Sequence, residues 1–446
     1  MQAEATVALA PPSTHWHARL HRLLPGLVLA GSRGGAVAAQ MAVQVVVGAL
    51  AGASGLGILQ LFTSWSCMAG EVLALGLPAR TMRTVAVDYA NGDVSAIRAN
   101  SAGAVSRILR AWLPLAVAAL VIAAVAYSAL NPGDIGDYMI IALAVLLAAP
   151  MFSLLRLGAD ALKGADAPLA AVTLENLGPP TAILVTCTAC WLLDKPVLVP
   201  ILLIAGIAGF AATSLGLWAA LRRQLQNCKP ATGHGQRDQH PEHNDLRYLW
   251  GNSVLSIAYL HLPFLLLPWY ADTTEIGVYA VAHKLINVVT TLLILLAAVF
   301  GPAFARAAAA GDRAALRHLL RRTQVISSVI YLPIAIGLLL ACQPLATLFS
   351  LQPGALWPFL LVLAAGHLIN AVTGLSGVML NMAGAAALEL RVLATCALGA
   401  VIASTLVGPG YGALGLACVF SGTIAVKNLA SYAVARRYLN QSETHS

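Results

Sequence analysis

The sequence predicts an all-α integral membrane protein, with twelve transmembrane helices in two six-helix parallel repeats around a central cavity. The first observation is composition. Of the 446 residues, 59% are hydrophobic and 10% are charged, whereas soluble domains carry about 25% charged residues. The second is a series of long apolar segments along the whole chain, and the third is an internal repeat that relates its two halves.

The apolar segments set the number of spans. A helix needs about 20 predominantly apolar residues to cross the hydrocarbon core of a bilayer. Twelve segments meet this requirement, at residues 27–51, 57–79, 108–130, 138–159, 168–191, 197–219, 248–270, 277–300, 325–349, 355–381, 388–407 and 411–435. Because twelve is even, both ends of the chain are expected on the same side of the membrane.

The distribution of basic residues predicts the orientation. Alternate loops carry no Lys or Arg, apart from Lys195 in the loop at 192–196. Because cytoplasmic loops are rich in Lys and Arg, we expect both termini in the cytoplasm. The first 22 residues lack the apolar core of a signal peptide, and we interpret them as a cytoplasmic tail. The loops of the other set carry nearly all remaining basic residues, among them Arg98, Arg110, Lys163, Arg222, Arg313 and Arg317.

The internal repeat divides the chain into two lobes. Residues 92–98 match residues 311–317 at an offset of 219 (311 minus 92). Residues 112–116 match 331–335 at the same offset, and 56–58 match 276–278 at an offset of 220. Parallel repeats of this kind place a transport site between the halves, near the middle of the membrane. We therefore predict a cytoplasmic tail at 1–22, a six-helix lobe at 23–219, a cytoplasmic linker at 220–247 and a second lobe at 248–446.

Polar residues form stripes inside five of the predicted spans. A charged side chain at the centre of a span costs about 2.5–3.5 kcal/mol on insertion scales, so its position is informative. At helical spacing, polar stripes on helices of both lobes predict a shared hydrated cavity. The stripes comprise Arg33, Gln40 and Gln44; Gln60, Ser64, Cys67 and Glu71; Asn252, Ser256 and Tyr259; Tyr279, His283, Lys284, Asn287, Thr290 and Thr291; and His367, Asn370, Gly374 and Asn381.

The charged members of these stripes have alternative interpretations. Arg33 lies close enough to the cytoplasmic end of its span to extend toward the headgroups. Lys284 lies roughly 12 Å from the outer end of its span, which favours a cavity role. Glu71 is either half of an ion pair with Arg33 or Lys284, or a site that couples transport to H⁺ or Na⁺. Glu175, just before Pro179-Pro180, predicts a buried helix break.

Several motifs resemble the polysaccharide flippases of the Wzx type. This family belongs to the multidrug/oligosaccharidyl-lipid/polysaccharide exporter superfamily. The similar segments are residues 55–59, residues 276–285, the Gly311-Asp312 loop after Pro302, and residues 411–417. The resemblance implies a fold like that of the multidrug exporters (MATE-like). It also implies transport, without enzymatic activity, of an oligosaccharide on undecaprenyl pyrophosphate across the bacterial inner membrane, for O-antigen, capsule or exopolysaccharide synthesis.

The resemblance also implies roles for residues of the stripes. Lys284 and, less closely, Arg33 match basic positions that hold the diphosphate in this family, and polar side chains offer hydrogen bonds to sugars. The sequence contains no pattern that predicts a catalytic residue, a metal site, a cofactor or nucleic-acid binding. The expected partners are the lipid bilayer, the lipid-linked oligosaccharide, and a polysaccharide polymerase with its chain-length machinery. The predicted sugar-contacting residues are Gln40, Gln44, Gln60, Asn252, Tyr279, His283, Asn287 and Asn370.

Two other functions stay open. A cation-coupled multidrug exporter of the same superfamily would favour acidic cavity residues, whereas the cavity candidates here are net basic. A polytopic enzyme that polymerises polysaccharide would need sizeable loops for its catalytic residues, and the predicted outward loops are very short. The chain has no Walker lysine motif, so we do not expect it to hydrolyse ATP.

Overall fold

The computed structural model describes residues 14–129, 137–228 and 243–440. Part of the predicted tail and part of the predicted linker lie outside these residues. Arg33 and Thr290 lie in helices, but their side chains are also outside the described set. The domain boundaries therefore stay predictions.

The described chain is helical throughout, with thirteen α-helices and one 3-10 turn. Eight helices within it are long and apolar enough to cross a membrane. Eight such helices describe a multi-pass membrane protein. The helices are α1 (Thr14–Leu73), α2 (Leu77–Ala90), α3 (Val94–Ala129), α4 (Asp137–Gly164), α5 (Pro168–Leu192), α6 (Val199–Gln226), α7 (His243–Leu266), η2 (Leu267–Trp269), α8 (Thr273–Ala309), α9 (Arg313–Leu340), α10 (Cys342–Leu348), α11 (Leu356–Thr373), α12 (Ser376–Met382) and α13 (Ala386–Asn440).

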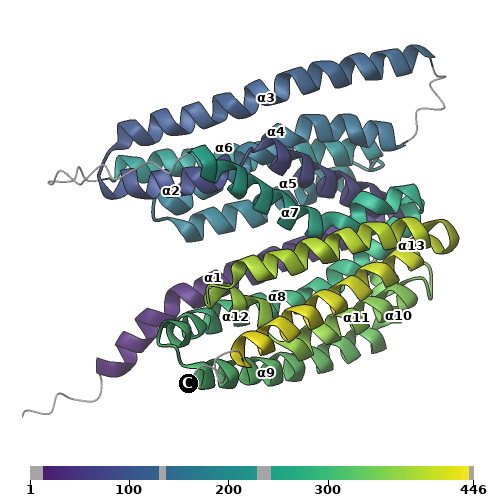
Figure 1. The fold of residues 1–446 in the computed structure, drawn as a ribbon. Helices are drawn as coiled ribbons and strands as arrows, with labels where there is room; N and C mark the ends of the chain where they lie inside the picture. The colour runs from purple at the N-terminus through teal and green to yellow at the C-terminus, as the bar shows by residue number, and fades with distance from the viewer. Residues whose placement is uncertain (1–13, 130–136, 229–242, 441–446) are drawn as a thin grey trace, which may run out of the picture.

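The twelve predicted spans map onto these helices. Two long helices each hold two spans, because a glycine reverses the chain inside them. Gly52 in α1 has φ 66° and Gly412 in α13 has φ 54°, both in the left-handed region that glycine adopts without steric cost. Figure 1 shows α2–α6 in an upper group and α8–α13 in a lower group, while α1 begins at the lower left and contacts both.

The internal repeat predicted from the sequence is also visible in the structure of two loops. Gly92 has φ 68° and Gly311 has φ 67°. The Asp93 carboxylate accepts a bond from Ala96 N at 2.9 Å, and the Asp312 carboxylate accepts one from Ala315 N at 2.8 Å. Each aspartate therefore caps the helix that follows it. The two loops have the same local structure, as two copies of one unit would.

The two groups of helices approach most closely where α1 crosses α8. A Cβ atom added at Gly57 would collide with the carbonyl oxygen of Thr273, and one added at Gly277 would collide with that of Ala53. Gly57 and Gly277 are the repeat-related pair at offset 220. Small residues spaced four apart let membrane helices approach backbone to backbone. The Ser54 and Thr273 hydroxyls hydrogen-bond across the same contact at 2.7 Å.

Two details of the predicted spans differ from the structure. The expected break at Pro179-Pro180 is wrong, because α5 continues through both prolines. The predicted tenth span is divided instead at Gly374, which has φ 63° and separates α11 from α12.

The close contact between α1 and α8 predicts how substitutions at Gly57 change the stability of the protein. Gly57→Val should lower the free energy of unfolding by about 1–3 kcal/mol, the usual cost of inserting a side chain into a packed contact. Gly103→Ala is the matched control, because a Cβ at Gly103 meets nothing within 4 Å. It should leave the protein as stable or slightly more stable. Thermal unfolding of the purified variants in detergent measures both, and equal melting of Gly57→Val and wild type would contradict the close approach.

Candidate functional site

Three small cavities adjoin one another between and beside the two groups of helices. Their volumes are about 190, 150 and 250 Å³. Gln40, Gln60 and Lys284 line both the first and the second cavity. His283 and Asn287 line both the second and the third. The cavities therefore form one continuous line of polar side chains, which we call the polar seam.

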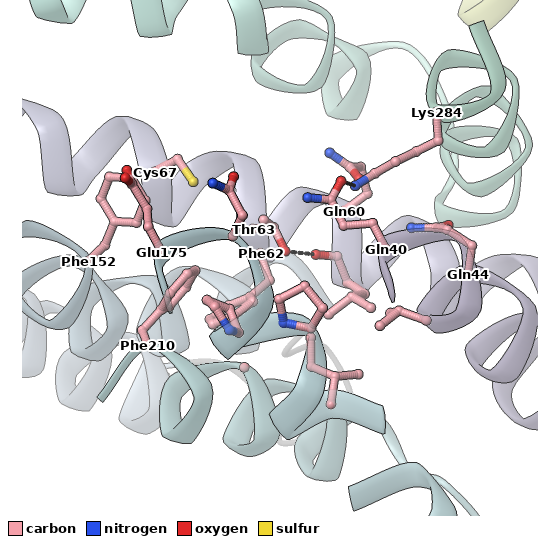
Figure 2. A pocket seen from close by; sticks show the side chains of 17 residues that line it. Gln40, Gln44, Gln60, Phe62, Thr63, Cys67, Phe152, Glu175, Phe210 and Lys284 are labelled. Atoms are coloured by element: carbon pink, nitrogen blue, oxygen red, sulfur yellow. Dashed lines mark hydrogen bonds between the residues drawn. The ribbon is translucent and has the colours of Figure 1, made fainter. Parts of the chain in front are cut away.

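Lys284 occupies the centre of the polar seam. It lies on α8, seven residues after Gly277, which is about 10 Å along the helix. Its Nζ donates a hydrogen bond to Gln40 Oε1 on α1 at 3.3 Å. Figure 2 shows the lysine extending toward Gln40 and Gln60, with Glu175 and Cys67 at the other side of the cavity. Among the described residues, no carboxylate forms an ion pair with Lys284.

Amide side chains of α1 surround the lysine. Gln60 Nε2 donates to Ser64 Oγ at 3.0 Å, one turn farther along the helix. Gln44 is 3% exposed, and its Oε1 has no hydrogen-bond partner in the described part of the chain. A buried acceptor without a partner costs about 1–3 kcal/mol, so the cavity holds unused hydrogen-bonding capacity.

On the other side of the polar seam, aromatic rings hold the polar groups in place. Tyr279 stacks on His283 with ring centroids 5.9 Å apart, and Phe264 meets both rings edge-on. Asn287 and His283 hydrogen-bond through the amide nitrogen and a ring nitrogen at 3.1 Å. The Tyr279 hydroxyl is buried and has no partner among the described atoms. Asn370 on α11 completes the lining of this cavity.

Some predicted site residues lie elsewhere. Asn252 is exposed on α7 and lines none of these three cavities. The Arg33 side chain lies outside the described residues. Glu71 is 2% exposed and forms no ion pair with Lys284 in the described part of the chain, so the predicted pair with Lys284 is wrong, whereas a pair with Arg33 lies outside the described residues. The reason is a cation from the fourth predicted span, Arg156, whose Nε lies 3.7 Å from the Glu71 carboxylate.

Sequence reasoning missed the ion network to which Glu71 belongs. Arg156 Nη1 donates to Glu175 Oε1 at 2.6 Å, and Lys163 Nζ donates to Glu175 Oε2 at 3.1 Å and to Asp160 at 2.9 Å. Arg156, Asp160 and Lys163 lie on one face of α4, four and three residues apart, a spacing that brings side chains together. With three carboxylates and two cations, the network carries a formal charge of −1. The arginine inside a predicted span was the signal that could have revealed it.

The second lobe holds a smaller ion pair. Lys427 Nζ lies 2.6 Å from Glu389 Oε1, and the Ser431 hydroxyl donates to Glu389 Oε2 at 2.7 Å. Lys427 also lines the third cavity. In the part of the chain that the structure describes, no cluster of three His, Cys, Asp or Glu residues could hold a metal ion.

Comparisons with solved structures identify the architecture. An inward-facing MATE-family multidrug resistance transporter of the MOP superfamily matches with a TM-score of 0.72 at 16% identity, covering 92% of this chain and 95% of that one. This chain has the fold of the MATE transporters. A MOP-superfamily transporter from Pyrococcus furiosus, described as having a binding pocket of reverse polarity, matches with a TM-score of 0.62 at 16% identity over 93% and 94%.

The MATE fold is shared with a flippase. The lipid II flippase MurJ in an inward closed conformation matches with a TM-score of 0.63 at 11% identity, covering 92% of this chain and 87% of that one. Residues 247–352, which include Lys284, match a family described as polysaccharide biosynthesis protein. No curated protein matches the chain.

The ion network predicts a specific energetic coupling. Arg156→Met should lower the free energy of unfolding by about 3–5 kcal/mol, because it leaves the buried Glu71 without a cation and leaves Glu175 with Lys163 alone. Arg156→Met combined with Glu175→Gln should recover part of that loss. Thermal unfolding in detergent measures both variants, with the exposed Arg107→Gln as the control. A double variant no more stable than Arg156→Met alone would show that the network is not energetically coupled.

Proposed function

We propose that this protein is a flippase that moves an oligosaccharide linked to undecaprenyl pyrophosphate across the bacterial inner membrane. The observation that carries the proposal is Lys284, a cation in the polar seam without an acidic partner among the described residues. The match of residues 247–352 to a polysaccharide biosynthesis family supports the substrate class. MurJ, a flippase with a similar fold, supports the proposal that this chain is also a flippase.

The chemistry of Lys284 suits a lipid diphosphate. In a low-dielectric cavity an unpaired ammonium attracts an anion far more strongly than it does in water. Its present partner, Gln40, is neutral, so a phosphate oxygen can replace the glutamine with a gain in charge complementarity. Arg33 is the second cation that we propose for the diphosphate, on sequence grounds alone.

The neutral polar groups of the seam suit a glycan. Sugar hydroxyls both donate and accept hydrogen bonds, and the amides of Gln44 and Gln60 and the Tyr279 hydroxyl can do both. The aromatic stack of Tyr279 and His283 offers an apolar face beside them. The lipid tail needs no site in the cavities, because it can stay in the bilayer while the polar head crosses.

The contacts between the lobes support a cycle of alternating access. Three contacts close one end of the molecule: Gly57 with Gly277, Ser54 with Thr273, and Tyr138 OH with Ala271 O at 3.2 Å. We assign this end to the outer face, from the predicted charge distribution of the loops. Rocking of the lobes about the seam would open these contacts and release the substrate outside.

We further propose that H⁺ or Na⁺ binding at the Glu71 network drives the cycle. Its formal charge of −1 favours a cation, and Glu71 Oε2 has no hydrogen-bond partner among the described atoms. A cation-coupled multidrug exporter is the second candidate, because the same acidic network and the MATE fold both suit it. The two candidates differ in the charge of the substrate, which is anionic for the flippase and cationic for the multidrug exporter.

Lys284 therefore provides the decisive substitution. Lys284→Met should reduce flipping at least tenfold while the protein still inserts, because the variant keeps most of the side-chain length and removes the charge. Lys284→Arg should retain part of the activity. The measurement is surface polysaccharide output, together with lipid-linked oligosaccharide in the inner membrane, in cells whose only copy is the variant.

Two results would reject the flippase. Normal polysaccharide output from Lys284→Met would remove the diphosphate contact. Deletion of the gene that leaves polysaccharide unchanged but lowers resistance to cationic drugs would support the exporter. Thr63→Ala, which changes a neutral residue of the first cavity, is the control for general damage to the seam.

A further inference from the structure

A much larger hollow lies on the flank of the first lobe, between α3, α4 and α6. Its volume is about 1120 Å³. None of its lining residues also lines a cavity of the polar seam. Met151 and Leu154 line it from α4, whereas the neighbouring Phe152 lines the first cavity of the seam. The hollow, which we call the α3–α6 groove, is therefore a separate site on the other face of these helices.

The groove combines apolar walls with positive charge. Arg98, Arg110 and Arg222 line it, and no Asp or Glu among the described residues does. Within the described residues, none of the three arginines forms an ion pair. Ser101, which also lines the groove, is 5% exposed, and its hydroxyl has no hydrogen-bond partner there. The remaining walls are mostly apolar, with Leu109, Leu113, Leu154, Leu215 and Trp218.

The second lobe shows what the same place looks like when it is closed. At offset 219, Arg98 corresponds to Arg317 and Ser101 to Leu320. Leu320 packs in a core with Leu439 of α13. Arg317 Nη2 donates to Leu439 O at 3.1 Å and so joins α9 to α13. The place that corresponds to the groove is therefore filled by packed side chains in the second lobe and is open in the first.

The dimensions of the groove match one leaflet of a bilayer. On α6 its lining extends from Gln226 to Ala211, and the part from Arg222 to Ala211 covers eleven residues, or about 16 Å along the helix. Half of the hydrocarbon core of a bilayer is about 15 Å thick. The charge distribution of the loops predicts that Arg222 lies at the cytoplasmic surface. A lipid whose acyl chain lies in the groove would therefore have its headgroup beside Arg222 and Arg98, which the loop charges place on the same side of the membrane.

We propose that the α3–α6 groove binds an anionic phospholipid of the cytoplasmic leaflet. Its phosphate contacts Arg98 and Arg222, and an acyl chain lies along Leu215 and Trp218. Arg110, twelve residues or about 18 Å farther along α3 than Arg98, adds its positive charge from within the groove. Guanidinium groups form paired hydrogen bonds with phosphate oxygens, and the Ser101 hydroxyl supplies a further donor. In the second lobe, Leu320 and Arg317 join α9 to α13. The bound lipid joins the corresponding helices of the first lobe, α3 and α6. This proposal does not depend on the flippase function.

Lipid binding by the purified full-length protein tests the proposal. Native mass spectrometry in detergent would measure the affinity for palmitoyl-oleoyl phosphatidylglycerol. Replacing Arg98, Arg110 and Arg222 together with Gln should weaken binding on the order of 100-fold, about fivefold for each basic residue near an anionic lipid. A matched triple of exposed arginines outside the groove, Arg83, Arg107 and Arg321, should leave it unchanged when they are replaced with Gln.

A second variant separates the apolar wall from the charges. Ser101→Leu installs the residue of the second lobe and should occlude the groove, weakening binding of phosphatidylglycerol while every arginine is retained. It should also melt no lower than wild type in lipid-free detergent, because Leu320 is accommodated at the equivalent place. Phosphatidylcholine and inorganic phosphate are the comparison ligands, and both should bind far more weakly than phosphatidylglycerol.

The contrary results are equally specific. Equal phosphatidylglycerol binding by wild type and the groove triple would overturn the proposal, as would equal binding of phosphatidylcholine. Full competition by inorganic phosphate would show that the groove binds only a headgroup and not an acyl chain. If undecaprenyl pyrophosphate displaced phosphatidylglycerol and the groove triple lost flipping, the groove would belong to the substrate tail and the assignment to phospholipid would be wrong.

Discussion

The close approach of Gly57 and Gly277 is the contact on which the arrangement of the two lobes depends. Without a Cβ on either residue, the backbones of α1 and α8 meet at the point where the two repeats cross. The contact fixes the positions of the residues that lie one to two turns farther along each helix. Gln60 follows Gly57 by three residues, and Lys284 follows Gly277 by seven. The crossing therefore sets both the closed end of the molecule and the position of the polar seam.

Charge compensation explains why Lys284 differs from the other ionisable groups in the bundle. Arg156 and Lys163 are held by the carboxylates of their own lobe, and Lys427 by Glu389. Such pairing lowers the cost of charge within a membrane. Among the described residues, Lys284 has only the neutral Gln40 as a polar partner. A cation maintained at that cost without a counter-ion is well placed to take an anionic ligand, and a lipid diphosphate is the ligand that we propose.

The sequence predicted the fold well, because the features that decide it are local. Span length, loop charge and the Gly-Asp turns are each readable from short segments, and the Gly311-Asp312 turn has the structure that its copy at Gly92 implies. Pairing between distant helices was harder. Nothing near Glu71 in the sequence indicates Arg156, because the two are joined only after α1 and α4 pack. The stripes predicted which faces are polar, and only the packing of the helices shows that Asn252 is exposed while Gln40 meets Lys284.

The central claim is that the polar seam holds the diphosphate of the substrate at Lys284. The most direct test is a cryo-electron microscopy structure of the full-length protein with an undecaprenyl pyrophosphate oligosaccharide bound. We predict diphosphate density within hydrogen-bonding distance of Lys284 Nζ, with the contact to Gln40 broken and the glycan beside Gln44 and Gln60. Substrate density elsewhere, with the bond between Lys284 and Gln40 intact, would contradict the account.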